Sequence, residues 1–219
     1  MLDAQTPGWL KWLEKRMGWL AVPNIAILLV TLQAAGFLFV LMDGAWFSNL
    51  ALVPQAVLQG GQYWRLITWL ALPASMSPIF MLFGLWFLYF VCNLIENEWG
   101  AFKTTFYILI SMLIAITYSL TTGYPIAEAT RFQSTLFLAA AALFPDMQVS
   151  LFMVFPVKVK WLAWFTLALL ALEFARTGWL ERFYIIAIFS NCLIFFGPAL
   201  INDLRQRARR RAYRKKLDP

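Results

Sequence analysis

From Ile25 to Met42 the chain reads IAILLVTLQAAGFLFVLM, without a single charged side chain. A helix of this length rises roughly 27 Å, close to the ~30 Å hydrocarbon core of a bilayer. Pro23 and Asn24, immediately before the stretch, favour a helix start. The stretch therefore predicts a transmembrane helix.

The composition extends this prediction to the whole chain. Of 219 residues, 62% are hydrophobic and 13% charged, whereas soluble domains are about 25% charged. Further apolar runs predict helices at residues 79–95, 104–120, 132–144, 161–172 and 183–201. We thus expect an all-α, polytopic membrane protein with about six transmembrane helices in one domain. The helix 132–144 covers only about 20 Å, so it should lie centrally, shielded by its neighbours.

The connection between the first two predicted helices, residues 43–78, is apolar but interrupted by prolines and glycines. Such a segment should not span, and we expect it to lie in the membrane interface, where its backbone needs protein partners. Before the first helix, residues 1–22 combine tryptophan with lysine, which predicts an amphipathic interfacial segment rather than a signal peptide. Residues 23–201 would form the membrane domain and residues 202–219 a basic tail.

The net charge of +7 is unevenly placed along the chain. On one side of the predicted topology lie Lys11, Lys15, Arg16, Lys103, Lys158, Lys160 and the tail residues Arg205, Arg207, Arg209, Arg210, Arg211, Arg214, Lys215 and Lys216. On the other side lie Arg65, Arg131, Arg176 and Arg182. Positive charge favours the cytoplasmic side, so both termini are predicted there, and a bacterial inner membrane fits. The tail should attract anionic lipid rather than nucleic acid.

Chemistry that needs histidine or paired cysteines is not indicated. The chain has no histidine, which removes the commonest general base and metal ligand. Cys92 and Cys192 both fall in apolar runs without a partner at metal-binding spacing. We expect no metal, no cofactor and no disulfide framework.

A short motif after the first helix points to a family. Residues 61–68 read GQYWRLIT, and the residues that carry the resemblance are Gly61, Gln62, Trp64, Arg65 and Thr68. This stretch resembles the first-loop signature of the rhomboid superfamily, in which a membrane-embedded loop follows helix 1. Weaker similarities follow in order: Glu96 with Gly100, Phe144 with Pro145, and the start of a fifth helix around Pro156, Lys160, Trp161 and Leu162. The resemblance implies a rhomboid-like six-helix bundle.

The catalytic part of the family pattern is missing. Active rhomboids share Gly-x-Ser-Gly at the start of the fourth helix and a histidine in the sixth, whereas this chain has Gln133-Ser134-Thr135 and Ser190-Asn191 at the corresponding places. A serine hydroxyl needs a neighbouring base to become a nucleophile, and an asparagine amide cannot act as one. Ser134 is therefore interpreted as an ordinary helix-start or packing residue, and Leu72-Pro73 resembles the inactive, derlin-type branch.

The resemblance implies a non-catalytic rhomboid-like protein, a pseudoprotease that binds transmembrane clients. The client would enter between the second and fifth helices, where rhomboids are thought to admit substrates. The facing residues there would be Met81, Phe83, Trp86, Phe87, Trp161, Trp164, Phe165 and Leu169. Plain lipid-facing packing explains the same residues. Two alternatives stay open: a serine protease with an unusual base that uses Ser134, and a small channel, transporter or assembly scaffold.

Four polar residues remain as candidates. Arg65 is expected to donate hydrogen bonds to loop carbonyls that lipid cannot satisfy, or else to contact lipid phosphate or a client. Glu128 and Arg131 are expected to form a local helical ion pair. Together with Asn191 they could alternatively form the polar mouth of a cavity above the short fourth helix.

Overall fold

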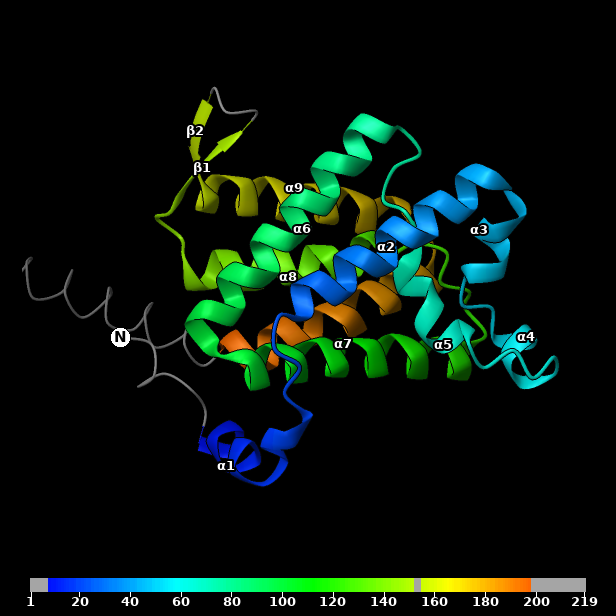
Figure 1. The fold of residues 1–219 in the computed structure, drawn as a ribbon, viewed down its shortest axis with the longest axis horizontal. Coiled ribbons are helices and arrows are strands. Elements are labelled where there is room, and N and C mark those ends of the chain that lie inside the picture. Colours follow the sequence, from blue (N-terminus) through cyan, green and yellow to red (C-terminus); the bar gives the residue numbers. More distant parts are fainter. Residues whose placement is uncertain (1–7, 152–154, 198–219) are drawn as a thin grey trace, which may run out of the picture.

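The computed structural model describes residues 8–151 and 155–197 and is mostly helical (Figure 1). The first 22 residues were predicted to be amphipathic and interfacial. Their described part contains α1 (Gly8–Met17) and the 3-10 helix η2 (Gly18–Leu20), while residues 1–7 lie outside the description. Glu14 of α1 forms an ion pair with Lys103, with 3.9 Å between the carboxylate oxygen and Nζ. This contact joins α1 to the start of α7 (Ala101–Thr122).

The first predicted transmembrane helix is confirmed as α2 (Ile25–Met42), with the predicted bounds. Asp43 follows in an extended conformation and ends the helix. In the apolar connection after it lie four short helices: α3 (Ala45–Leu50), α4 (Pro54–Leu58), α5 (Arg65–Thr68) and η3 (Trp69–Ala71). The longest has six residues, or about 9 Å, so none of the four can cross a bilayer.

The second predicted helix is longer than expected. It was expected to stop at Ile95 before the charged residues, but α6 runs from Pro78 to Trp99. The charges are tolerated because they lie in the last turns of the helix, and Glu96 Oε1 accepts a hydrogen bond from the backbone N–H of Asn24 at 2.7 Å. The helix ends at Gly100, whose φ of 89° is accessible mainly to glycine. The third predicted helix, 104–120, is α7 with two to three further residues at its ends.

The short central helix is α8 (Thr130–Leu143), which packs against both α6 and α9 (Val159–Arg176). Between α8 and α9 the chain forms an unpredicted antiparallel hairpin of β1 (Gln148–Leu151) and β2 (Phe155–Lys158), with Gln148 opposite Lys158. The two strands are only four residues each, too short for a clear alternating pattern. The last described helix begins at Trp179, four residues earlier than predicted, and is described to Gly197. Its predicted end at Ile201 and the tail 202–219 lie outside the description.

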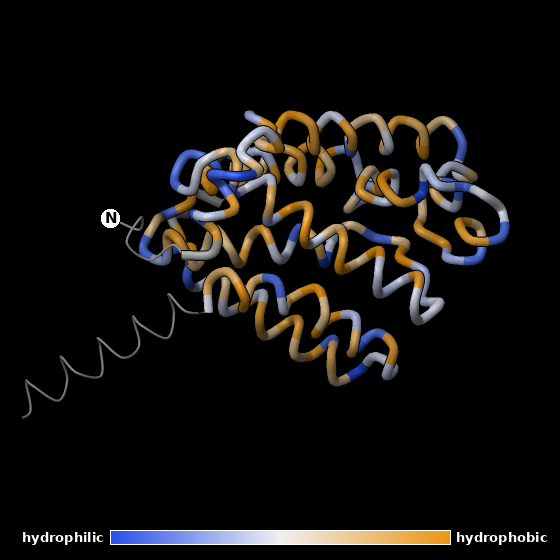
Figure 2. Tube along the Cα trace, turned by 90° about the horizontal axis from the view of Figure 1, so that it is seen from below, coloured by the Kyte–Doolittle hydropathy of each residue, from blue (hydrophilic) through white to orange (hydrophobic). Residues whose placement is uncertain are grey.

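Four of the described helices are long and apolar enough to cross a membrane: α2, α6, α7 and the helix Trp179–Gly197. The other two predicted spans fall short for different reasons. The helix α8 has 14 residues, whereas α9 has 18 but carries Lys160, Glu173 and Arg176. Hydrophobic residues predominate along the helices, and many hydrophilic residues lie near their ends (Figure 2). Six spans were predicted and four are found by length and composition.

Candidate functional site

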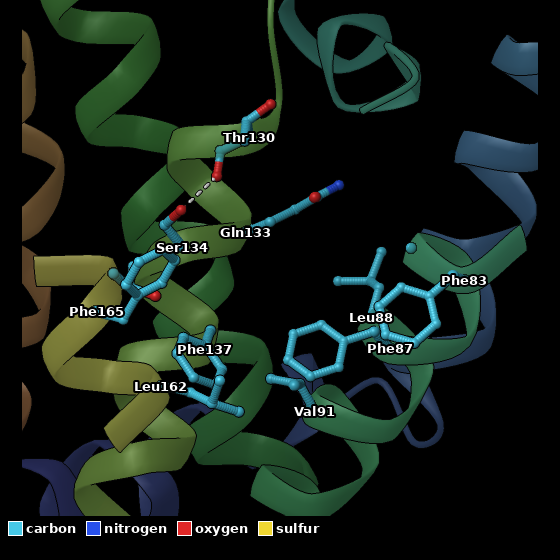
Figure 3. A pocket seen from close by; sticks show the side chains of 12 residues that line it. Phe83, Phe87, Leu88, Val91, Thr130, Gln133, Ser134, Phe137, Leu162 and Phe165 are labelled. Carbon is cyan, nitrogen blue, oxygen red and sulfur yellow. Dashed lines mark hydrogen bonds between the residues drawn. The ribbon is translucent and has the colours of Figure 1, made fainter. Parts of the chain in front are cut away.

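A groove lies at the side of the bundle, between α6, α8 and α9 (Figure 3). We call it the lateral groove. Its lining residues are Phe83, Gly84, Phe87, Leu88 and Val91 of α6, Thr130, Gln133, Ser134 and Phe137 of α8, and Leu162, Phe165 and Thr166 of α9. The walls are thus largely aromatic and aliphatic, while the three polar side chains of α8 gather near its N-terminal end. A volume of about 270 Å³ admits a few side chains rather than a whole helix.

Some of the residues predicted to face a client do line the lateral groove. Phe83 and Phe87 lie one turn apart on α6, and Phe165 faces them from α9. Met81 does not, because it is 1% exposed. It precedes Phe83 by two residues, about 200° around the helix, so the two side chains point to opposite sides of α6.

The other predicted facing residues lie outside the lateral groove. Trp86, Trp161 and Leu169 are exposed but are not among its lining residues. Trp164 belongs to a separate groove on another side of α9. Composition identifies apolar residues without giving the rotation of each helix, so the sequence does not show which of them line the groove.

The hydroxyl of Ser134 is hydrogen-bonded within α8. It donates a hydrogen bond to the carbonyl oxygen of Thr130 at 2.9 Å (Figure 3). Asn191, the other candidate from the family pattern, is fully buried, and its Nδ2 donates to the carbonyl oxygen of Tyr107 at 3.0 Å and to Ser111 Oγ at 2.6 Å. Asn191 thus joins the last helix to α7 and lines neither the lateral groove nor the polar cavity described below. The two residues do not form a nucleophile–base pair.

Gln133 is a residue of the lateral groove that the sequence analysis did not select. Its side chain extends from α8 into the groove (Figure 3). Within the described part of the chain, this half-buried amide has no hydrogen-bond partner. An amide has two donors and an acceptor, and leaving them unpaired in an apolar medium costs several kcal/mol. Gln133 therefore provides a polar contact point on otherwise apolar walls.

Beside the lateral groove, at the N-terminal end of α8, Arg131 is the centre of a charged cluster. The predicted ion pair with Glu128 is present, with 3.1 Å between Nη1 and Oε1. Arg131 is only 8% exposed, and it also donates to Glu173 Oε1 of α9 from Nε at 3.1 Å and from Nη2 at 2.5 Å. Its guanidinium lies 5.4 Å from the centre of the Tyr184 ring. The cluster thereby joins α8, α9 and the last helix.

A polar cavity of about 360 Å³ opens next to this cluster. Its lining residues are Tyr124, Pro125, Ile126, Ala127, Glu128, Arg131 and Glu181. The hydroxyl of Tyr124 donates a hydrogen bond to Glu181 Oε1 at 3.1 Å, and burial raises the pKa of Tyr124, so this donor keeps its proton. The structure places Glu128 and Arg131 at a cavity mouth and Asn191 elsewhere. Glu173, Glu181 and Tyr124 were missed because they lie far from Arg131 in the sequence or carry no local pattern.

Arg65, from the loop motif, holds the first loop together. It is 6% exposed. Its Nη1 donates to the carbonyl oxygens of Ser48 at 2.6 Å and Ala51 at 2.7 Å, and its Nε donates to Gln62 Oε1 at 2.6 Å. Thr68, also from the motif, donates to the carbonyl oxygen of Leu50 at 3.2 Å. The motif residues thus satisfy backbone carbonyls of an apolar loop. Trp64, in contrast, is exposed.

Residues 24–195 match the model of a family described as "Eukaryotic integral membrane protein (DUF1751)". No curated protein and no solved structure matches the chain. The description of the family as eukaryotic gives no support to the predicted bacterial inner membrane. The match covers well over half of the chain and includes every helix that lines the lateral groove. The chain therefore belongs to this family of eukaryotic integral membrane proteins.

Proposed function

We propose that the chain is a rhomboid-like membrane protein without protease activity that binds the transmembrane helices of client proteins at the lateral groove. The observation that carries the proposal is the unpartnered amide of Gln133 between apolar walls. In a membrane, such an amide gains most from a polar group that arrives on another helix. A client helix would pack across α6 and α9, and its side chains would enter the groove.

The arrangement of charge supports the rhomboid-like topology within this proposal. The N-terminal ends of α7 and α9, with Lys103 and Lys158, lie at the same end of the bundle as α1 (Figure 1). The first-loop helices α3, α4 and α5 lie at the opposite end (Figure 1). The end with α1 would face the cytoplasm by the positive-inside rule. With α8 and α9 embedded beside the four long helices, both termini would be on that side.

The chemistry around Ser134 supports a binding role over a catalytic one. The hydroxyl already donates to a backbone carbonyl, and the chain has no histidine that could accept its proton. A serine without a base is a weak nucleophile. We therefore expect the purified protein in lipid to leave a generic transmembrane rhomboid substrate uncut, and Ser134→Ala to behave as the wild type. The measurement is a gel-based cleavage assay with an active rhomboid as positive control. Cleavage that disappears in Ser134→Ala would overturn the non-catalytic proposal.

Client binding is tested by photo-crosslinking in the membrane from two matched positions. Phe165 lines the lateral groove and is 62% exposed, whereas Leu28 of α2 is 60% exposed and does not line it. A photoreactive amino acid at position 165 should capture transmembrane peptides, and the same amino acid at position 28 should capture lipid. Gln133→Leu should lower the capture at 165 by about fivefold, since a hydrogen bond contributes about 1 kcal/mol.

Ser134→Ala is the control for Gln133→Leu, because Ser134 lines the same groove but has its partner within α8. It should leave capture at position 165 unchanged. The proposal fails if the two positions capture the same proteins, or if Gln133→Leu and Ser134→Ala change capture equally.

A further inference from the structure

A second and larger groove lies between α8, α9 and the last described helix. We call it the Lys160 groove. Its lining residues are Leu138, Ala141, Ala142, Lys160, Ala163, Trp164, Leu167, Leu170, Ala171, Phe174, Ile185, Phe189, Cys192 and Leu193. Lys160 is the one charged residue among them, and the remaining surface is almost entirely apolar. The groove has no residue in common with the lateral groove, so the two sites can be tested separately.

The shape of the Lys160 groove fits a chain of methylene groups. Its lining residues on α9 extend from Lys160 to Phe174, a rise of about 21 Å, which exceeds the ~15 Å of one hydrocarbon leaflet. The volume is about 650 Å³. Spread over that length, it gives a mean cross-section of about 30 Å², which lets an acyl chain lie within the groove along its length. A helix about 10 Å across could lie only over this groove, as a client would at the lateral groove.

The position of Lys160 supplies charge at one end of this groove. Lys160 lies in the first turn of α9, and the neighbouring Lys158 and the α1 segment lie at the same end of the bundle (Figure 1). Lys160 Nζ is 3.1 Å from Asp146 Oδ1, and 40% of the lysine side chain is exposed. An ammonium group has three protons, so Lys160 can donate to a second acceptor while it keeps Asp146.

We infer that the Lys160 groove holds an anionic phospholipid of the surrounding leaflet. One acyl chain would lie along the groove between α9 and the last helix, and the phosphate would accept a hydrogen bond from Lys160. Removing an acyl chain from water is favourable by about 0.8 kcal/mol per CH₂. In a bilayer the chain is already out of water, so this term does not favour the Lys160 groove over any other site. Selectivity for this site comes from Lys160, whose charge favours an anionic over a zwitterionic head group.

The test uses the full chain in lipid nanodiscs with photoreactive phospholipids that carry the reactive group on an acyl chain. Phosphatidylserine and phosphatidylcholine with identical chains are compared, and the labelled peptides of α9 and the last helix are measured by mass spectrometry. Phosphatidylserine should label the groove about fivefold more than phosphatidylcholine, equivalent to about 1 kcal/mol for one lysine near the head groups.

Two pairs of variants distinguish the effect of the Lys160 charge on lipid labelling from the effect of the shape of the groove. Lys160→Gln should lower phosphatidylserine labelling to the phosphatidylcholine level. Asp146→Asn, which removes the same ion pair but keeps the ammonium group, should not. Ala171→Phe fills the groove and should reduce labelling by both lipids, whereas Ala168→Phe, on an exposed position of α9 that does not line it, should leave labelling unchanged.

Equal labelling by the two lipids in the wild type, or labelling that Ala171→Phe does not reduce, would overturn the assignment.

Lipid-dependent stabilisation gives a second readout that does not depend on photochemistry. Phosphatidylserine should raise the thermal midpoint of the wild type and of Asp146→Asn more than that of Lys160→Gln. An equal rise in all three would also contradict the role of Lys160.

Discussion

Replacing Gly36 with alanine is expected to destabilise the folded chain by about 3 kcal/mol, the upper end of the usual cost of overpacking. Gly36 lies in α2 where this helix packs against η3 of the first loop. A Cβ at this position would meet the carbonyl oxygen of Ala71 at 2.0 Å and its carbonyl carbon at 2.8 Å. The clash is with backbone, which cannot rotate away as a side chain can. Either α2 or the first loop must move.

Gly84 offers the matched control, since it also lies inside a long apolar helix, α6. A Cβ at Gly84 would have no atom within 4 Å. Alanine there should be neutral or raise stability by up to about 1 kcal/mol, because glycine is a poorer helix former. The measurement is the thermal unfolding midpoint of each variant and of the wild type in the same detergent. If Gly36→Ala and Gly84→Ala melt together, the close approach of α2 and η3 is wrong.

Arg65→Leu should cost about 4 kcal/mol of stability and expose the first loop to proteases. The substitution removes the donors to the carbonyl oxygens of Ser48 and Ala51 and to the side chain of Gln62. A buried acceptor left without its donor costs about 1–3 kcal/mol, and lipid offers no replacement. Arg65→Lys should lose about half as much, since an ammonium group can still donate to the two carbonyl oxygens but lacks the Nε–H that donates to Gln62.

Thermal unfolding and limited proteolysis of the loop measure these effects, with Arg176→Leu as the control. Arg176 is an exposed arginine at the end of α9, so its loss should change stability by no more than about 0.5 kcal/mol. A wild-type midpoint and wild-type protease resistance in Arg65→Leu would mean that the loop does not depend on this side chain.

The sequence predicted best where the cause of structure is local. The helix Ile25–Met42 has no charged residue, and its predicted bounds are those of α2. The long connection after it was correctly predicted not to span, because its prolines and glycines interrupt every helical run. The short central helix was likewise predicted within two residues of α8. The bounds of these helices, and the absence of a span between them, follow from local composition and from the positions of proline and glycine.

The errors concern contacts between distant segments. The extension of α6 beyond Ile95 involves Glu96, which accepts a hydrogen bond from Asn24, 72 residues away. Met81 was placed on the facing surface because it is apolar, but its direction depends on how α6 is rotated in the bundle. Glu173, which pairs with Arg131, is 42 residues away from it. Gln133 was overlooked because it lies among other polar residues at the start of α8, and the sequence does not show which of them enters the groove.

The Arg131–Glu173 contact has a consequence for how the chain is made. As ribosomes deliver the protein to the membrane, α8 emerges with a charged arginine and only 14 residues, too few to cross the lipid alone. Glu173, which pairs with that arginine, is synthesised 42 residues later. Until then the partners of Arg131 are Glu128 and Tyr124, both of which precede it in the sequence. We expect the translocation machinery to hold α8 until α9 has been synthesised and then to release the two helices into the bilayer as a unit, joined by the hairpin between them.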